Sequence, residues 1–453
     1  MRSRFLRRTK LLRASLLLTL GTIACGGRTE FIDLEGDDWS SSGGAPVPTG
    51  GRSSDGGAPS SGGSGPGPSG GQDSGGTSAG GSSSGGTAGS GGAASGGAQN
   101  SCAPDGVEMQ LVNSGGIDVA FALTRTKAEL LVAGHYWSGP PDTQTYHSAI
   151  ARLAPDDRLL DDIRANFAEY DAPRGIALHP SGSVFLAGVA TETTQDPPYR
   201  SLVVRFSAQG LAWRADERSQ KNEQATAIAA GPAGTTYVVG YSYGALGTDD
   251  QPRAFLRRYL DVDSGTSTVA YDVSDFARLD AITIGERGRL YLAGSSLIAG
   301  QYRAHVRVIE RSGTLVRDML FEERTEQANA LLLKDDGTIV VAGSGAHGAF
   351  AKWITPEGLE LFTSWVAAFG ETTTTGALAL DARGAVWWVG GSPEVNSSFL
   401  TNLMEDGDRP WTSLFDGSAH AMVGDDSCNL YLAGDFGLGE GRGPLLKVRG
   451  GAE

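Results

Sequence analysis

The sequence predicts an all-β protein, a seven-bladed β-propeller of four-stranded antiparallel blades that follows a disordered, Gly/Ser-rich linker. Two observations predict this fold. A short apolar segment ending in glycine recurs seven times, and its copies are 44 to 54 residues apart, which is room for four strands each. The region before the repeats is too rich in glycine and serine to form a core. The recurring glycines are Gly134, Gly188, Gly240, Gly294, Gly343, Gly390 and Gly434.

Composition separates a foldable body from the rest of the chain. Residues 41–100 contain 23 Gly and 15 Ser, so they bury too little apolar surface to offset their chain entropy. Residues 101–453 carry 29 basic and 45 acidic residues, a net charge of −16. An acidic body repels phosphate backbones and anionic lipid headgroups, so neither nucleic acid nor direct membrane binding by the body is expected.

The N-terminus has the pattern of an export signal. Residues 1–13 are basic and residues 14–24 are apolar and small. Eleven apolar residues cannot span a bilayer core, which needs about 20. Residues 1–24 are therefore interpreted as a signal peptide and the protein as exported.

The end of this signal resembles the lipobox of bacterial lipoproteins, because the apolar stretch runs into Thr22-Ile-Ala-Cys25-Gly26. Thr22 stands where leucine is commonest. The resemblance implies that Cys25 is diacylated and anchors the protein to the membrane, and Gly26 in place of aspartate favours the outer membrane. The alternative is an ordinary signal peptide with an incidental cysteine. Residues 25–101 are then a lipid-bearing, disordered tether, and residues 102–453 the propeller.

Aligned on the seven glycines, the copies share a 14-residue register without gaps, which predicts a hairpin. Its turn column suits positive φ. The first position of the register holds a small residue, as expected if the first strands converge on a crowded axis. Copy one departs, with Ala128 in the turn and Phe121 in the first column. The turn column elsewhere is Gly182, Gly234, Gly288, Gly337, Gly384 and Cys428, and the first column is Gly175, Ala227, Ala281, Ala330, Ala377 and Ala421.

Ring closure supports the count of blades. The seventh copy supplies three strands, and a spare strand at 107–113 precedes the first copy. That strand completes the last blade and removes the exposed edges, so a monomer is expected. A solenoid would need capping repeats instead, and none is visible.

The hairpins, of the form D/P-x-G-x-φ-φ-φ-A-G with φ apolar, resemble the SBBP-type seven-bladed β-propeller repeats of secreted bacterial proteins. The resemblance covers residues 107–450. It implies the fold and leaves the chemistry open, because propellers serve many functions.

The cysteines besides Cys25 are Cys102 and Cys428. Cys428 begins the second strand of the last blade, and Cys102 lies five residues before the strand that completes the same blade. Both fall on one face, so a disulfide is predicted, with two free thiols as the alternative.

The familiar catalytic and cofactor motifs are missing or incomplete. The sequence lacks a P-loop, HExxH and CxxC, and GSGAHG at 343–348 precedes a strand pattern where a dinucleotide site needs a helix. Six scattered histidines show no metal-ligand spacing, although distant residues can meet at the axis. No catalytic residue, metal or cofactor is therefore assigned.

Two sets of residues are candidate sites. Aromatic residues in the loops between strands two and three form a candidate binding face, the alternative being that they pack over neighbouring blades. Polar residues just before the first column form a candidate channel ring, the alternative being a wet channel. The face comprises His135, Tyr136, Trp137, Tyr146, Tyr199, Tyr241, Tyr243 and Phe436, and the ring Arg174, Asp280, Asn329 and His420.

These observations favour a non-catalytic binding or scaffold module at the cell envelope, with a protein or glycan ligand. Nothing in the sequence distinguishes this binding module from a partner in outer-membrane protein assembly. The alternative is a hydrolase or lyase that acts on glycans at the central channel. A deep axial cluster of acids, histidine and arginine with perturbed pKa values would favour the enzyme.

Overall fold

The computed structural model describes residues 108–450, apart from short gaps within the chain. The predicted signal, tether, Cys25 and Cys102 lie outside the described residues. The described part is built of strands, with one short 3-10 turn, η2 (Glu286–Gly288), and no helix in it is long and apolar enough to cross a membrane. The gaps are 140–144, 180, 192–198, 208–209, 217–221, 232–234, 245–250, 261–266, 323–325, 368–372, 393, 405, 407–408, 410 and 439–440.

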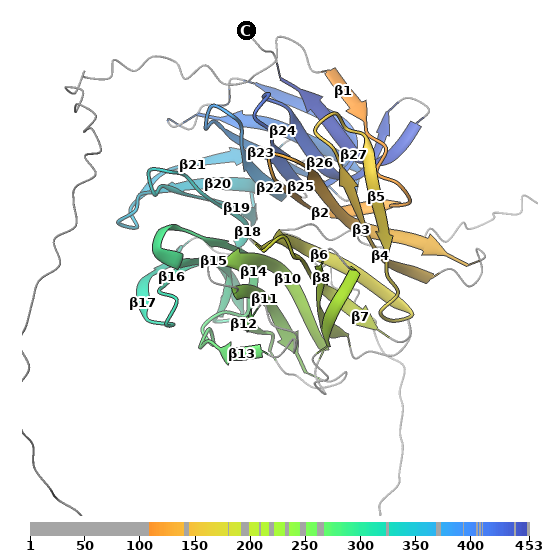
Figure 1. The fold of residues 1–453 in the computed structure, drawn as a ribbon. Coiled ribbons are helices and arrows are strands. Elements are labelled where there is room, and N and C mark those ends of the chain that lie inside the picture. The colour runs from red at the N-terminus through yellow and green to blue at the C-terminus, as the bar shows by residue number, and fades with distance from the viewer. Residues whose placement is uncertain are drawn as a thin grey trace, which may run out of the picture. The chain divides into compact units, whose positions relative to one another are not determined.

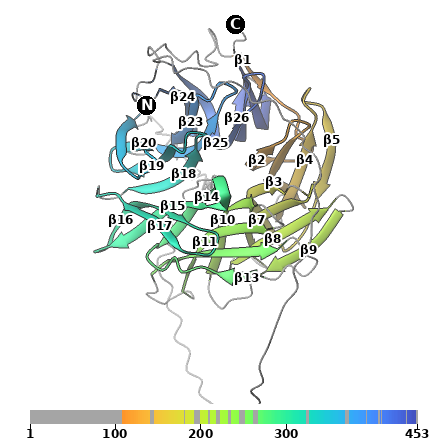
Figure 2. The same cartoon turned by 60° about the vertical axis from the view of Figure 1, so that its left-hand side comes forward.

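The fold is a β-propeller, in which four-stranded antiparallel blades surround a common centre (Figures 1 and 2). Three blades are separate sheets. Their strands are β10 (Asn222–Gly231), β11 (Thr235–Tyr243), β12 (Arg253–Leu260) and β13 (Ser267–Ala270); β14 (Arg278–Ile284), β15 (Leu290–Ile298), β16 (Gln301–Ile309) and β17 (Leu315–Leu320); and β18 (Gln327–Leu333), β19 (Ile339–Gly345), β20 (Gly348–Ile354) and β21 (Glu360–Val366).

An eight-stranded sheet contains two more blades, β2–β5 and β6–β9. A parallel pairing of Tyr146 on β4 with Tyr170 on β6 links them. The strands are β2 (Val119–Arg125), β3 (Leu130–Ser138), β4 (Thr145–Leu153), β5 (Leu159–Arg164), β6 (Tyr170–Leu178), β7 (Val184–Thr191), β8 (Arg200–Ser207) and β9 (Gly210–Asp216).

A seven-stranded sheet arises because one long strand, β25 (Thr412–Gly424), serves two blades. Its first residues pair with β24, and its residues from Gly417 onward pair with β26. The remaining strands are β1 (Glu108–Leu111), β22 (Thr374–Leu380), β23 (Val386–Ser392), β24 (Ser397–Leu403), β26 (Leu430–Leu438) and β27 (Gly441–Arg449).

The first strands of successive blades contact one another in a closed cycle: β2, β6, β10, β14, β18, β22, β25 and again β2. The outer edge of the last blade is covered by β1, which pairs antiparallel with β27 from Glu108 opposite Arg449. The two side chains also form an ion pair, with 3.0 Å between Arg449 Nη1 and Glu108 Oε1. This strand lies within the segment predicted to complete the last blade.

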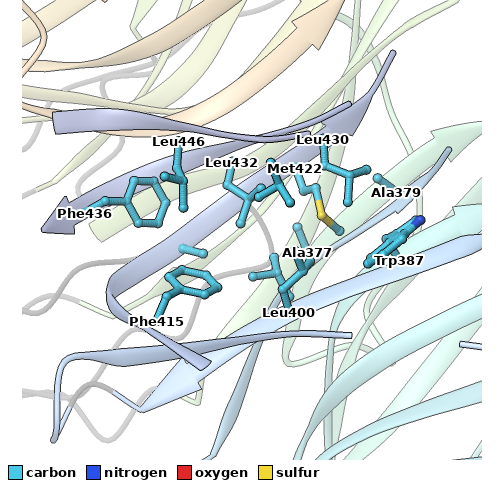
Figure 3. Packing of buried hydrophobic residues seen from close by; sticks show 13 residues of the cluster. Ala377, Ala379, Trp387, Leu400, Phe415, Met422, Leu430, Leu432, Phe436 and Leu446 are labelled. Carbon is cyan, nitrogen blue, oxygen red and sulfur yellow. The ribbon is translucent and has the colours of Figure 1, made fainter. Parts of the chain in front are cut away.

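The core lies between neighbouring blades. In the cluster of Figure 3, Trp387 and Leu400 from one blade pack with Met422 and Leu432 from the next. The following residue, Trp388, packs on the opposite side of its blade. Strands buried on both faces need near-continuous apolar runs, which explains the repeated segments such as VWWVG. A similar cluster joins the first and last blades, so apolar packing also closes the ring.

A β-bulge interrupts each first strand at the same place, and the repeated glycine lies beside it. In the β14–β15 hairpin the register shifts between Leu279 and Ala281. A Cβ on Gly294 would lie 2.1 Å from the carbonyl oxygen of Arg278. Corresponding contacts of 2.0 to 2.2 Å occur at Gly134, Gly188, Gly240, Gly343, Gly390 and Gly434. Glycine therefore ends each apolar segment because the bulged strand leaves no room for a side chain.

The predicted register is wrong in copy one. Gly134 pairs with Ala120, whereas Gly188 pairs with Pro173, one residue further back along the chain. The first turn is one residue shorter, because the Thr126 N–H donates to the Glu129 carbonyl, while later turns span one residue more. Ala122 therefore occupies the small position, and Phe121 is the bulged residue. The turn column has positive φ as predicted at Gly182, Gly288, Gly337, Gly384 and Cys428.

We predict that Gly294→Ala destabilises the protein, because its Cβ meets a backbone oxygen that cannot move without opening the bulge. The expected loss is about 1–3 kcal/mol or more in the free energy of unfolding, measured by urea denaturation. Gly437→Ala is the control, since a Cβ there meets nothing within 4 Å. Equal effects of the two substitutions would contradict this explanation of the repeat.

Candidate functional site

The bulge of each first strand takes one residue out of the pairing with the second strand. The candidate channel residues Arg174, Asp280, Asn329 and His420 are the bulged residues of β6, β14, β18 and β25. The structure brings Arg174 and His420 together against Phe121, the bulged residue of β2. Asp280 and Asn329 have other neighbours.

Six side chains from three blades form what we call the axial cluster: Phe121, His135, Trp137, Tyr146, Arg174 and His420. The Phe121 ring stacks on His420 at 5.4 Å between centroids and 21° between planes, and lies 5.2 Å from His135. The Arg174 Cζ lies 5.1 Å from the Phe121 centroid. On the other side of His135, Trp137 and Tyr146 lie 5.2 and 5.1 Å away.

Strand alternation explains which residues of β3 reach this cluster. Leu131 and Ala133 pack toward the second blade, and His135 and Trp137 continue that face along the strand. Tyr136 points the other way, where its ring contacts His147 and the guanidinium of Arg164. Tyr136 therefore does not join the axial cluster.

His135 differs from the other buried histidines because neither of its ring nitrogens has a hydrogen-bond partner among the described residues. Both ring nitrogens of His135, and Nε2 of His420, are buried without a partner among the described residues. His147 lies 3.4 Å from Asp171, and His305 2.7 Å from Asp318. The residues His135 and His420 are 8% and 3% exposed, so these nitrogens are not solvated from the surface. Buried polar atoms are normally paired.

Burial and charge keep both imidazoles neutral. Burial and, second to it, the nearby Arg174 charge lower the pKa of His135 to about 3. The pKa of His420 is also lowered to about 3, by burial, by Arg174 and by His135. Each ring therefore carries one N–H donor and one acceptor at neutral pH.

The other two channel residues are held by their own blades. Arg278 Nε lies 3.0 and 2.8 Å from the two carboxylate oxygens of Asp280, and both side chains are buried. Burial raises the pKa of the Asp280 carboxyl, and the guanidinium opposes this shift. Asn329 accepts a hydrogen bond from Ser344 at 3.2 Å, while its Nδ2 is unpaired among the described residues.

The aromatic residues of the candidate face lie on strand ends more often than in loops. Tyr241 and Tyr243 stack at 5.9 Å on β11 and are bridged by Gln224. Tyr199 lies within electrostatic reach of Tyr146 and Tyr243, whose pKa values are raised mainly by burial. These residues extend the axial cluster toward the third blade.

Phe436 does not belong to this face. It is fully buried against Phe415 within the last blades, because β26 continues past Gly434 as a strand. Phe436 therefore fits the alternative interpretation, in which the aromatic residue packs against neighbouring blades.

Sequence reasoning missed Tyr170, whose ring lies 5.1 Å from Tyr146, and Arg278, whose Cζ lies 4.9 Å from the Tyr241 centroid. Both lie further before the 14-residue register than the candidate channel residues, which directly precede it, so the repeat carries no signal for them. Phe121 was noticed only as an exception.

Cys428 is disulfide-bonded. Its partner lies outside the described residues, so the pairing with Cys102 stays a prediction. Within the described residues, no group of three or more metal-ligating side chains comes together.

No family model and no curated protein matches the sequence. Solved structures are similar at low identity. Virginiamycin B lyase from Staphylococcus aureus is 11% identical, with 76% of this chain and 99% of that chain covered and a TM-score of 0.49. YCF48 bound to a D1 peptide is 9% identical, with 79% and 100% covered and a TM-score of 0.48. The Dos1 propeller is 10% identical, with 71% and 75% covered and a TM-score of 0.45. At these values no ligand, activity or site residue is carried over to this chain.

The axial histidines predict acid sensitivity. A histidine with a folded pKa near 3 and an unfolded pKa near 6.5 stabilises the unfolded state as the pH falls between these values. Between pH 7 and pH 4.5, His135→Leu should therefore lose about 2–3 kcal/mol less stability than the unsubstituted protein. Urea denaturation at both pH values measures this. His347→Gln, at an exposed histidine, is the control and should not change the loss.

Proposed function

We propose that this protein is an exported lipoprotein whose SBBP-type, seven-bladed propeller acts as a non-catalytic binding or scaffold module at the cell envelope. The observation that carries the proposal is the axial cluster. It combines half-buried aromatic rings, a cation and unpaired buried imidazoles on a rigid ring. Such a combination supplies contact area and hydrogen bonds for a ligand.

The protonation of the cluster favours binding over catalysis. General acid–base catalysis is most efficient when the pKa of the catalytic group lies near the working pH. His135 and His420, with pKa values near 3, are neutral and weakly basic at pH 7. The buried carboxylate of the ring, Asp280, is engaged by Arg278. These groups therefore suit recognition better than proton transfer.

A second candidate is a hydrolase or lyase that acts on glycans. One observation favours it: histidine, arginine and tyrosine do gather near the axis, and their pKa values are perturbed. Bound substrate that brought a carboxylate to His135 would raise the pKa of that imidazole toward a catalytic range.

We expect a ligand to stabilise the protein without being consumed. A thermal-shift screen with glycans, peptidoglycan fragments and peptides is the measurement. Saturation at 100 times the dissociation constant should add about 2.7 kcal/mol to the stability. Mass spectrometry of the ligand after incubation separates the two candidates, because recovery of the intact ligand supports a binding module and conversion to products supports the enzyme.

The proposed anchor is Cys25, followed by a tether of about 75 residues with an r.m.s. span of roughly 45–50 Å. Cys25→Ala should move the protein from the membrane fraction to the soluble fraction of a bacterial host, detected by immunoblot after ultracentrifugation. Cys428→Ala is the control and should leave fractionation unchanged. Membrane retention of the Cys25 variant would contradict the lipid anchor.

A further inference from the structure

We infer that the outer edge of β17, with the groove beside it, binds an extended, basic segment of a partner protein by β-strand addition. This surface lies on the rim of the fourth and fifth blades, which are formed by β14–β17 and β18–β21 (Figure 1). It shares no residue with the axial cluster, so the inference goes beyond the proposed function. Three features carry it: a groove with an apolar rim, a strand edge without a neighbour, and an uncompensated carboxylate.

An open groove of about 590 Å³ lies between the end of β17 and the turn that leads into β21. Met319 and Phe321 form its buried floor, and both belong to the apolar cluster between the two blades. Gly358, in the turn, allows a close approach, because a Cβ there would lie 2.6 Å from Arg317 Cδ and 3.2 Å from Met319 Sδ. The outer strands of two neighbouring blades therefore meet along this groove.

Large apolar side chains are concentrated on these two outer strands. Within the described residues, five of the nine exposed large apolar side chains lie on β17 or around the start of β21. A concentration of exposed apolar groups marks a surface that is covered in a complex. The five residues are Leu315, Val316, Leu320, Leu359 and Leu361.

The edge of β17 offers backbone hydrogen bonds to another strand. β17 is the last strand of its blade, and among the described residues it pairs with β16 alone. The Phe321 N–H donates to the Ala304 carbonyl oxygen at 3.0 Å. Because alternate residues of an antiparallel strand turn their peptide groups to opposite sides, Asp318 and Leu320 direct theirs outward. An edge of this kind is a template for an added strand.

Carboxylates line the groove, and two of them are compensated from within the protein. Asp318 accepts a hydrogen bond from Arg307 Nε at 2.8 Å and lies 2.7 Å from His305 Nε2. Glu360 lies 3.6 Å from Nζ of the buried Lys352. These two carboxylates are therefore not the groups that select the charge of a ligand.

The third carboxylate, Glu322, is exposed and has no ion pair or hydrogen bond among the described residues. The cation of the same strand, Arg317, lies over Gly358. Its charge acts on Glu357, because the pKa of that carboxyl is lowered by hydrogen bonding with Thr355 and by Arg317. Glu322 therefore remains available to a cation on a ligand.

A basic partner fits this surface better than a second copy of the chain. The body has a net charge of −16, so two bodies repel each other at close range. A strand with lysine or arginine among apolar residues would pair with the edge of β17, cover its leucines and place a cation beside Glu322. The aliphatic stems of lysine and arginine also pack on apolar surface.

The experiment is fluorescence polarisation with the purified full chain and three labelled octapeptides. The first alternates valine with lysine, the second alternates valine with glutamate, and the third is the lysine peptide with two central prolines. We expect the lysine peptide to bind with a dissociation constant between about 1 μM and 1 mM. The others should bind about tenfold more weakly or worse, since one is repelled by Glu322 and the other cannot complete a ladder.

Hydrogen exchange followed by mass spectrometry locates the added strand. When the lysine peptide binds, fragments that cover residues 315–322 should become protected, because the outward N–H groups of β17 are then bonded. Fragments that cover β9, the outer strand of the second blade, should exchange as before.

Substitutions test the charge and the apolar contact. Glu322→Lys should weaken binding of the lysine peptide about tenfold, and Leu320→Asn about fivefold. Asp161→Lys and Leu211→Asn are the matched controls, at an exposed acid of β5 and an exposed leucine of β9, and should bind normally. His135→Leu, in the axial cluster, should also bind normally. Circular dichroism checks that each variant is folded.

Equal binding of the lysine and glutamate peptides would overturn the inference, and so would equal binding of the proline peptide. Unchanged affinity in both Glu322→Lys and Leu320→Asn would do the same. Light scattering that shows a dimer, separated by Leu320→Asn, would overturn it in favour of a second copy. Loss of binding in His135→Leu would assign the peptide to the axial cluster instead. Absence of binding by any peptide at about 1 mM would overturn the inference and leave the proposed function in place, because the ligand screen tests that function separately.

Discussion

The close approach of a bulged inner strand to a glycine on its neighbour is the contact on which the ring depends. In every hairpin the carbonyl oxygen of the first strand lies where a side chain would begin, 2.0 to 2.2 Å from a notional Cβ. This contact lets the first strands crowd around one axis, and it turns one residue of each out of the ladder. The apolar packing between blades then follows, because each strand has a neighbour on both faces.

The same bulge creates the candidate site. A residue that leaves the ladder is free of strand alternation, so its type can vary between blades without disturbing the core. Phenylalanine, arginine and histidine at this position in the first, second and last blades are brought together by ring closure. The copy that departs most from the repeat, with its shortened turn, supplies the aromatic ring on which Arg174 and His420 both pack. The irregular copy of the repeat and the candidate site thus coincide in the first blade.

The axial cluster lowers the stability of the folded protein. Two buried imidazoles beside a guanidinium, with unpaired nitrogens, are unfavourable compared with apolar residues of similar size. The other buried histidines each bond through at least one ring nitrogen, to Asp171, Ser181, Ser296 or Asp318. A rigid ring with apolar packing between all neighbouring blades can support such a group, and residues that oppose stability commonly serve binding.

The propeller can be predicted from the amino-acid sequence, because the recurring glycine and its apolar segment reflect a local requirement of each hairpin. The sequence also indicated that Arg174 and His420 are equivalent positions, since each lies at the same distance before the repeated glycine, and both are bulged residues in the structure. The shortened first turn hid the true position of Phe121, because a one-residue deletion leaves the apolar pattern intact. That Arg174, His135 and His420 lie together, while Asp280 is held by Arg278, can be seen only in the folded protein. Those contacts join strands far apart in the chain, and no local pattern encodes the ring closure that brings them together.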